Sequence, residues 1–365
     1  MSAAPQQRAP LATNYPFKAF NADETIVTIN ATLRGESERC YVYVENGQEG
    51  TTNWEAIADF FTARVWEEDT RLFGEPYIVT NTSPKIVILY YRMKNDKGSE
   101  EKNILGFFYS RDMQTSGAIP GNEYSNGMNI FYMNLSFPYG PNHSEMQRTL
   151  FHEFQHMINY SRRTLVNGYP RMCTWMDEGL AESVEHYGLG TYGDSRVKSM
   201  NADRSGRLAN GCSLTVWTRD ADDINYGLAY TFLQYLRLQS TSAGWNILRT
   251  IFDHPSGDTP ALVAAMSATG GNSNLNTFEK MVYGYHTARF LNADSGLYSF
   301  GNERNNFKFT PRSPSKTINS STKIIAGGAL YLPTDDRAAL AAYSTDGSGR
   351  PSGAGASIRA YPHLP

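Results

Sequence analysis

The sequence predicts an α+β fold, with strands in its first part and helices after them. Short segments rich in β-branched and aromatic residues, bounded by turn residues, precede residue 140. Beyond residue 144, apolar residues recur at three- and four-residue steps, as they do in helices that face a core. The chain has 365 residues, 40% of them hydrophobic and 13% aromatic, which is enough for two or three packed domains or one large unit with an appendage.

The expected strands and helices follow one another along the chain. Asn53 is expected to cap a helix on which Trp54, Ile57, Phe61 and Val65 share one face. The predicted strands are Ile26–Leu33, Tyr41–Glu45, Lys85–Tyr91, Ile104–Tyr109 and Asn129–Leu135. The predicted later helices are Tyr226–Leu238, Trp245–Phe252, one opened by Thr259 and Pro260, and Phe278–Leu291.

Net charge and hydropathy exclude some classes of partner. The net charge of −3 gives no reason to expect a nucleic acid or a membrane surface. No apolar run approaches about 18 residues, so we expect no transmembrane segment. The first residues have neither the basic nor the apolar region of a secretory signal, so a signal peptide is expected to be absent from this chain.

The most informative segment is the helix expected after Ser144. Ser144 and Gln147 have the spacing of a capping box, which predicts that the helix starts just after Ser144. The helix then contains His152, Glu153 and His156 in the pattern H-E-x-x-H. Residues four apart on a helix lie side by side, so the two imidazoles can share one metal ion with a carboxylate beside them. A chance match, with two surface histidines on an amphipathic helix, has a probability on the order of one in a hundred.

A second helix offers a third metal ligand. Thr174 is a suitable N-cap, and Trp175, Leu180 and Val184 supply apolar positions after it. Glu178 follows His156 by 22 residues, which is enough chain for the second helix to turn back onto the first. Catalytic zinc takes three protein ligands and keeps a fourth position open, so the Glu178 carboxylate could complete the site.

H-E-x-x-H followed by W-x-x-E-G-x-A resembles the glutamate zincins (gluzincins), the group of thermolysin and the M1 aminopeptidases. Within that group, the chain is most similar to the hyicolysin-like M30 family of bacterial extracellular metallopeptidases. The resemblance covers roughly residues 24 to 240. It rests on three segments in addition to Glu178: Tyr124 to Tyr132, His152 to Tyr160, and Asn225 to Leu233.

This resemblance implies a thermolysin-like zincin fold and a set of residue roles. One Zn²⁺ per chain would be held by His152, His156 and Glu178, with Glu153 as the catalytic base. Two imidazoles and a carboxylate suit zinc and leave it acidic enough to activate water. Glu182, one helical turn beyond Glu178, is the expected acceptor for a ring proton of a ligand histidine, and the alternative is that Glu182 and Glu185 are solvated.

The oxyanion donor is less well defined by the sequence. By similarity to the M1 branch, Tyr226 is the first candidate for this role, although the spacing between the tyrosine and the next glycine is shorter here. Tyr230 and then His186 follow it. The chain has 23 tyrosines, and any one of them is more often a packing residue than a catalyst.

We expect an endopeptidase that acts on proteins or peptides. M1 aminopeptidases have a glutamate after G-x-M that holds the free amine of the substrate. Here Gly127 and Met128 are followed by Asn129, which gives that amine no counter-charge. The strand Asn129–Leu135 is expected to offer its backbone edge to an extended peptide. The alternative is a catalytically inactive binding or adhesin module on the same scaffold.

The expected organisation has four parts. Residues 1–20 form a flexible arm, 21–160 a β-rich upper lobe ending in the motif helix, 161–300 a helical lower lobe, and 301–365 a β-rich C-terminal segment, with β-like pieces such as Phe307–Phe309. Cys40, Cys173 and Cys212 allow a Cys173–Cys212 disulfide or three free thiols. The family resemblance implies an extracellular, secreted protein.

Overall fold

The protein is an α+β molecule in a computed structural model, with a curled N-terminal sheet and a helical C-terminal part. The structure describes residues 11–79, 83–95, 97–101, 103–114, 124–137, 142–204, 206–217, 223–240, 243–312 and 328–330. The chain divides into two compact units. Unit 1 comprises residues 1–171 and 184–191, and unit 2 comprises residues 172–183 and 192–365.

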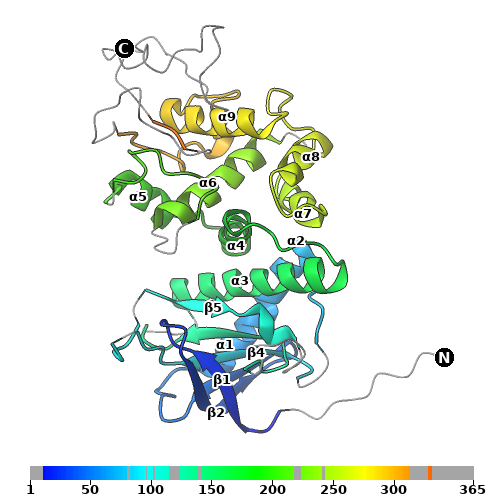
Figure 1. Cartoon of the computed structure of the whole chain (residues 1–365), viewed down its shortest axis with the longest axis vertical. Helices are drawn as coiled ribbons and strands as arrows, with labels where there is room; N and C mark the ends of the chain where they lie inside the picture. The colour runs from blue at the N-terminus through cyan, green and yellow to red at the C-terminus, as the bar shows by residue number, and fades with distance from the viewer. Residues whose placement is uncertain are drawn as a thin grey trace, which may run out of the picture. The chain divides into compact units, whose positions relative to one another are not determined.

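Unit 1 is built on one mixed sheet (Figure 1). Among the described residues its strands are β1 (Asn14–Phe20), β2 (Ile26–Glu36), β3 (Cys40–Glu45), β4 (Ile86–Tyr91), β5 (Gly106–Phe108) and β6 (Ile130–Asn134). Their order across the sheet is β1-β2-β3-β4-β6-β5. The strands β3, β4 and β6 run parallel, and the outer pairs are antiparallel.

The central strands are buried on both faces, which explains their unbroken apolar sequences. On one face, Leu89 and Tyr132 join an apolar cluster with Phe17 of β1. On the opposite face, the ring of Tyr90 lies 5.0 Å from that of Trp54. The helices of unit 1 therefore cover one side of the sheet, and the sheet's own outer strands contribute to the core on the other.

The helices of unit 1 are α1 (Trp54–Phe60), the π-helical η1 (Phe61–Trp66), α2 (Glu67–Phe73), the 3₁₀ turn η2 (Ser110–Met113), α3 (Ser144–Asn159) and the π-helical η3 (Tyr160–Val166). Asn53 caps α1 as expected, because its side chain accepts the Ala56 N–H at 3.1 Å. The expected apolar face of this helix is buried. Helix α3 contacts β5 and β6 and lies along the sheet in Figure 1.

The predicted arm over residues 1–20 is too long. Residues Asn14–Phe20 form strand β1, which pairs antiparallel with β2 from Asn14 and Thr32 to Phe20 and Ile26. Phe17 and Ala19 are fully buried in the cluster under the sheet. The alternation of buried and exposed residues in Asn14–Phe20 extends over too few residues to be recognised in the sequence. Pairing with β2 holds the segment as a strand. The first ten residues lie outside the described chain.

At the end of the sheet that contains β6, the edge strand is β5, which corrects the expectation for Asn129–Leu135. Strand β6 pairs with β4 on one side and with β5 on the other, so its backbone groups are used within the sheet. Strand β5 pairs only with β6 among the described strands. Phe107 of β5 stacks on Tyr132 of β6, with ring centroids 4.5 Å apart. This stacking fixes the short edge strand against its neighbour.

Tyr132 in turn belongs to a buried polar group around Asp112. The Tyr132 hydroxyl donates to Asp112 Oδ2 at 2.5 Å, and the Asn126 backbone N–H donates to Asp112 Oδ1 at 2.7 Å. Asp112 and Tyr132 are both fully buried. Burial raises the pKa of Asp112 to about 7, although the bonds from Tyr132 and Asn126 act in the opposite direction.

Unit 2 is helical. Its helices are the first part of α4 (Thr174–Leu189), α5 (Asp194–Ala202), α6 (Asp223–Gln239), α7 (Asn246–Asp253), α8 (Pro260–Ala268), α9 (Phe278–Leu291) and the 3₁₀ turn η4 (Gly301–Glu303). Helix α6 contacts α5, α7 and α9 and forms the centre of the unit. Helix α5 and the turn η4 were not predicted. In α5, Ser195, Lys198 and Ser199 interrupt the apolar pattern.

Helix α4 approaches α6 closely because of Gly179. A Cβ atom at this position would lie 2.9 Å from Leu233 Cδ1 and 3.1 Å from the carbonyl oxygen of Ala229. Ser183 on the same face of α4 accepts a hydrogen bond from Gln234 Nε2 at 2.9 Å. Residue 179 is therefore a glycine because a larger residue would separate the two helices.

The predicted β-rich tail is not found in the part of it that the structure describes. Phe307–Phe309, expected as a β-like piece, forms no strand. Phe307 is buried instead and stacks on Phe300 with ring centroids 4.9 Å apart. Most of the segment from residue 313 onward lies outside the described residues. Phe307, one of the aromatic residues that suggested a strand, is therefore a core residue of unit 2.

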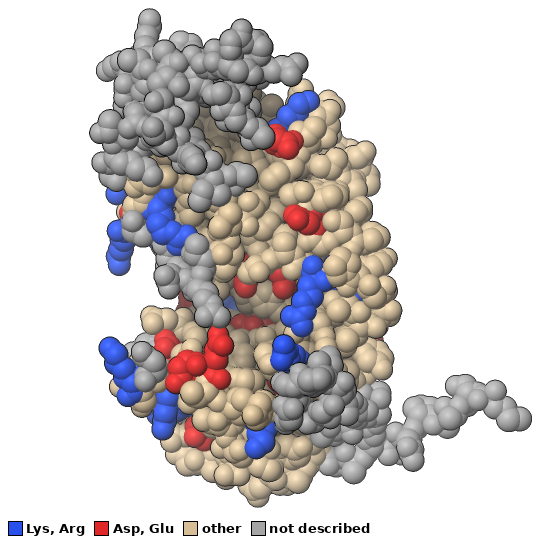
Figure 2. Space-filling view, viewed as in Figure 1, with Lys and Arg blue, Asp and Glu red and all other residues tan. Residues whose placement is uncertain are grey.

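Two general features complete the description. None of the described helices combines the length and apolar character needed to cross a bilayer. On the face seen in Figure 2, the described acidic and basic side chains are interspersed and do not gather in a block of one sign.

We expect Asp112→Asn to change how stability depends on pH. Native Asp112 keeps its proton up to about pH 7, whereas the unfolded chain releases it near the ordinary pKa of 3.8. Between these values the folded chain binds the extra proton, so the free energy of unfolding falls as pH rises. Denaturant titrations at pH 5 and pH 7.5 should show that the wild type loses roughly 2 kcal/mol more than the variant. Equal losses in both proteins would contradict this assignment.

Candidate metal centre

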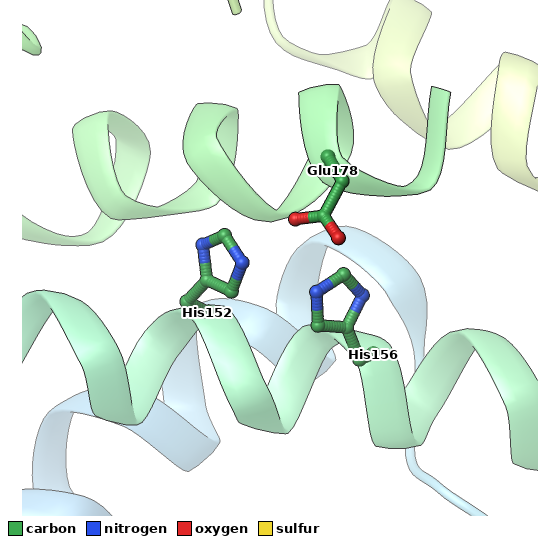
Figure 3. Close-up of side chains that lie close together, drawn as sticks. All are labelled: His152, His156 and Glu178. Carbon is green, nitrogen blue, oxygen red and sulfur yellow. The ribbon is translucent and has the colours of Figure 1, made fainter. Parts of the chain in front are cut away.

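Helix α3 presents the two motif histidines side by side. Their ring centroids are 4.8 Å apart, and Figure 3 shows both rings rising from the same side of the helix. The helix begins one residue earlier than expected. Ser144 is its first residue, His143 occupies the cap position without a side-chain cap bond, and the His143 carbonyl accepts the Gln147 N–H at 3.0 Å. The expected capping box is therefore wrong, and the helix is held by its buried apolar stripe.

The third predicted ligand lies with the two histidines. One donor atom each from His152, His156 and Glu178 can be chosen so that all three lie within 4.8 Å of one another. Figure 3 shows the Glu178 carboxylate pointing from α4 toward the imidazoles of α3. Two imidazole nitrogens and a carboxylate oxygen at this spacing fit the ligand set of a catalytic zinc ion, which these three residues would hold.

Glu153 is placed beside the edge strand of the sheet. It is buried, with 5% of its surface exposed. A Cβ atom at Gly106 of β5 would lie 3.3 Å from Glu153 Cγ and 2.7 Å from Thr149 Cγ2. The glycine therefore lets β5 lie directly against the flank of α3 that carries Glu153. The Glu153 side chain is therefore close to any peptide that pairs with strand β5.

His152 has a carboxylate partner, but that partner is Glu185. His152 Nδ1 lies 2.9 Å from Glu185 Oε1, and both side chains are largely buried within unit 1. Arg148, one turn before His152 on α3, places its Nη1 3.6 Å from the other oxygen of Glu185. A histidine that donates Nδ1–H to a carboxylate carries its lone pair on Nε2. This is the tautomer that a metal ligand needs.

Glu182, which we expected in that role, carries a different contact. Its carboxylate is 3% exposed and accepts from Arg196 Nε at 2.9 Å and from the terminal nitrogen Nη2 of the same residue. Donor atoms of His152, Glu182 and Glu185 can also be chosen within 4.8 Å of one another. Neither glutamate is solvated. The sequence pattern predicted that a glutamate after Glu178 binds a ligand histidine. It could not distinguish Glu182, one turn after Glu178, from Glu185, two turns after it.

Tyr226 contacts Arg196, the residue of unit 2 that binds Glu182. The Arg196 guanidinium lies 4.7 Å from the centroid of the Tyr226 ring, and Trp217 packs edge-on against that ring at 4.9 Å. Tyr226 is half-buried. Arg196 therefore contacts both the Glu182 carboxylate and the ring of the first candidate for the oxyanion donor.

The other candidates for that role are held in the interior. Tyr230 is fully buried and its hydroxyl accepts the Gly193 N–H at 2.9 Å. Burial also raises the pKa of Tyr230. His186 is 9% exposed. Tyr230 is a packing residue of α6, as most of the tyrosines were expected to be.

The three cysteines are free thiols. Cys40 is buried, and Cys173 and Cys212 are partly buried. Cys173 Sγ lies 3.8 Å from Asp258 Oδ1, and Cys212 Sγ lies 3.6 Å from an Arg207 nitrogen. Of the two alternatives left open by the sequence, the structure contains the free thiols.

Comparison with known proteins agrees with the family resemblance. No protein-family model matches the chain. The chain is similar to the neutral metalloprotease ShpI of Staphylococcus hyicus, with 30% identity over 289 residues. The match covers 72% of this chain and 63% of the relative, so the chain spans less than two thirds of the length of that protein. The expected relationship to a metallopeptidase of the hyicolysin type is confirmed by this match.

The chain is also similar to a solved structure of a two-domain M1 zinc metallopeptidase bound to L-tryptophan, with a TM-score of 0.39 and 14% identity. The alignment covers 71% of this chain and 49% of that chain. A likeness of this size carries no argument about the site.

We expect Arg196→Met to destabilise the fold. The substitution removes the guanidinium that binds the buried carboxylate of Glu182, and breaking such a pair costs roughly 3 kcal/mol. Lys198→Met is the matched control, because Lys198 lies on the same helix in an exposed ion pair with Asp194 and should lose less than about 0.5 kcal/mol. Unfolding by urea measures both variants. Equal effects would show that Glu182 does not depend on Arg196.

Proposed function

We propose that this chain, a relative of the neutral metalloprotease ShpI, is a zinc-dependent endopeptidase. The observation that carries the proposal is the cluster of His152, His156 and Glu178, with the buried carboxylate of Glu153 next to the first histidine on α3. On this proposal the fold is a thermolysin-like zincin, and the protein acts outside the cell. Its substrate is a protein or peptide.

His152, His156 and Glu178 would hold one Zn²⁺. When bound, the ion would polarise the scissile carbonyl and lower the pKa of water toward about 7. The chain itself orients the first ligand, because Glu185 accepts from His152 Nδ1 and Arg148 holds the opposite oxygen of Glu185. A neutral imidazole with its Nε2 lone pair free is the form of histidine that binds zinc.

Glu153 acts as the general base. Its carboxylate takes a proton from the attacking water and gives it to the amine that leaves. Its burial beside Gly106 of β5 limits the positions that the carboxylate can adopt. A base fixed in this way loses little rotamer freedom when the substrate binds.

Tyr226 is the proposed donor to the oxyanion. The support is its contact with Arg196, which also binds the carboxylate of Glu182 on the helix that carries Glu178. The ring is held between Arg196 and Trp217, so the hydroxyl has a defined direction. A hydroxyl that is positioned before the reaction stabilises negative charge at little reorganisation cost.

The edge of β5 is the proposed binding place for the substrate backbone. An extended peptide that paired with Gly106–Phe108 would run beside Glu153. Asn129 supports endopeptidase over aminopeptidase activity, because its amide accepts the Val79 N–H at 2.7 Å and donates to the Tyr77 carbonyl at 3.0 Å. Its side chain is therefore occupied within the fold and offers no anion for a free amine.

The second candidate function is a binding or adhesin module whose site has lost its activity. The intact set of ligand residues and the buried Glu153 favour the enzyme. A module without catalysis would have no need to keep a buried carboxylate next to a half-buried histidine, because burying such a group is unfavourable.

We expect Glu153→Gln to abolish hydrolysis of casein or of a quenched peptide while about one zinc per chain stays bound. The amide preserves shape but cannot accept the proton. Zinc content is measured by atomic emission, and phenanthroline should inhibit the wild type. Stoichiometric zinc in a wild type that cleaves neither substrate would favour the binding module.

Zinc affinity distinguishes the two glutamates. Glu185→Gln removes the carboxylate bound to His152 and should weaken zinc binding about 10- to 100-fold in a competition titration with a chromogenic chelator. Glu182→Gln keeps that bond and should change affinity by less than about threefold, because Glu182 is bound to Arg196. If Glu182→Gln had the larger effect, the expectation from the sequence would be right and our assignment of Glu185 wrong.

A further inference from the structure

Arg289 is a buried cation in helix α9 of unit 2. It is 2% exposed, and its Nε has no hydrogen-bond partner among the described residues. Its Nη1 lies 3.3 Å from His286 Nδ1. The guanidinium packs over two aromatic rings, 5.5 Å from the centroid of Tyr285 and 5.2 Å from that of Phe309. The ion pairs found in the described part of the chain include no carboxylate bound to Arg289.

A buried guanidinium without an anion is unfavourable. Removing a charge from water costs several kcal/mol unless an opposite charge or several hydrogen bonds replace the water. The two rings compensate for part of this cost through their negative faces. One ring nitrogen at 3.3 Å compensates for little more, and the Nε–H of Arg289 remains without a hydrogen-bond partner among the described residues. The side chain is therefore suited to an anion that the protein takes from solution.

A small cavity lies beside this guanidinium. Arg289 and Arg312 both line it, and it has about 10 Å³ of space, which is room for one water-sized species. Arg312 is fixed at the cavity because its Nη2 donates to the Asn201 carbonyl at 3.0 Å. The Thr310 N–H also donates to Asn201 Oδ1 at 2.7 Å. The segment that carries Arg312 is thus bound to the end of α5.

Asp203, the acidic residue among the described residues of the cavity wall, is already bound to its own turn. Asp203 accepts the N–H groups of Leu208 at 3.2 Å and Ala209 at 2.8 Å through its two oxygens. It forms no ion pair with either arginine of the cavity among the interactions of the described residues. Among the described residues that line the cavity, two cationic groups therefore face one carboxylate that already accepts two N–H groups.

We propose that this cavity binds one small inorganic monoanion, of the size of chloride, between Arg289 and Arg312. The size of the cavity selects against sulfate and phosphate, and the two guanidinium groups supply the charge. Binding to the folded chain alone would stabilise it in proportion to the logarithm of the free anion concentration. The anion would tie the segment around Phe309 and Arg312 to α5 and α9. This site is independent of the proposed peptidase activity.

The test compares potassium chloride with potassium methanesulfonate, whose anion is too large for the cavity, in thermal unfolding of the full chain at equal ionic strength. The wild type should melt about 2 °C or more higher in chloride, with a rise that follows the logarithm of the chloride concentration above the dissociation constant. Arg312→Gln should lose the difference between the two salts. Lys308→Gln is the matched control, because Lys308 is an exposed cation of the same segment that does not line the cavity, and it should keep the difference.

Two results would overturn the proposal. One is a wild type with the same melting temperature in both salts, and the other is an Arg312→Gln variant that responds to chloride as Lys308→Gln does. Arg289→Met removes the buried charge and should melt in methanesulfonate no lower than the wild type, without any response to chloride. If Arg289→Met does not fold, the comparison of Arg312→Gln with Lys308→Gln decides the question.

Discussion

The hydrogen bond between His152 and Glu185 is the contact on which the proposed centre depends. It joins the end of α4 that belongs to unit 1 to the middle of α3, at 2.9 Å and with both side chains largely buried. A single buried bond therefore bears on the tautomer of His152, the first of the proposed ligands. Arg148 supports it from α3.

The sheet places the proposed base by a second chain of contacts. Asp112 binds Tyr132, Tyr132 stacks on Phe107, and Phe107 belongs to the edge strand that Gly106 allows to lie against Glu153. Each of these contacts is buried or part-buried and lies within unit 1. The base is thus fixed by the packing of the sheet edge as much as by its own helix, which is what precise positioning of a catalytic group requires.

Unit 2 uses arginines in two ways. Arg196 compensates a buried carboxylate, Glu182, and touches the ring of Tyr226. Arg289 is buried among aromatic rings, without a carboxylate partner in the described part of the chain. In the first arrangement the negative charge of Glu182 is balanced by Arg196 within the fold. The second leaves a positive charge beside a cavity, and we infer that an anion from solution completes it.

The sequence by itself determined the features that depend on local periodicity. The apolar stripe of α3 and the spacing of His152 and His156 place two imidazoles on one helix face whatever surrounds them. The α+β order of strands and helices and the cap at Asn53 followed in the same way. Tertiary structure decided the rest, because it joins residues that are distant in the chain. In the tertiary structure His152 is bound to Glu185 and not to Glu182. Strand β5, and not β6, lies at that edge of the sheet, and β1 is held by its pairing with β2. Phe307, which the sequence placed in a strand, is a core residue without strand structure. Its burial depends on the residues that pack against it in the tertiary structure and not on the local alternation of apolar and polar residues.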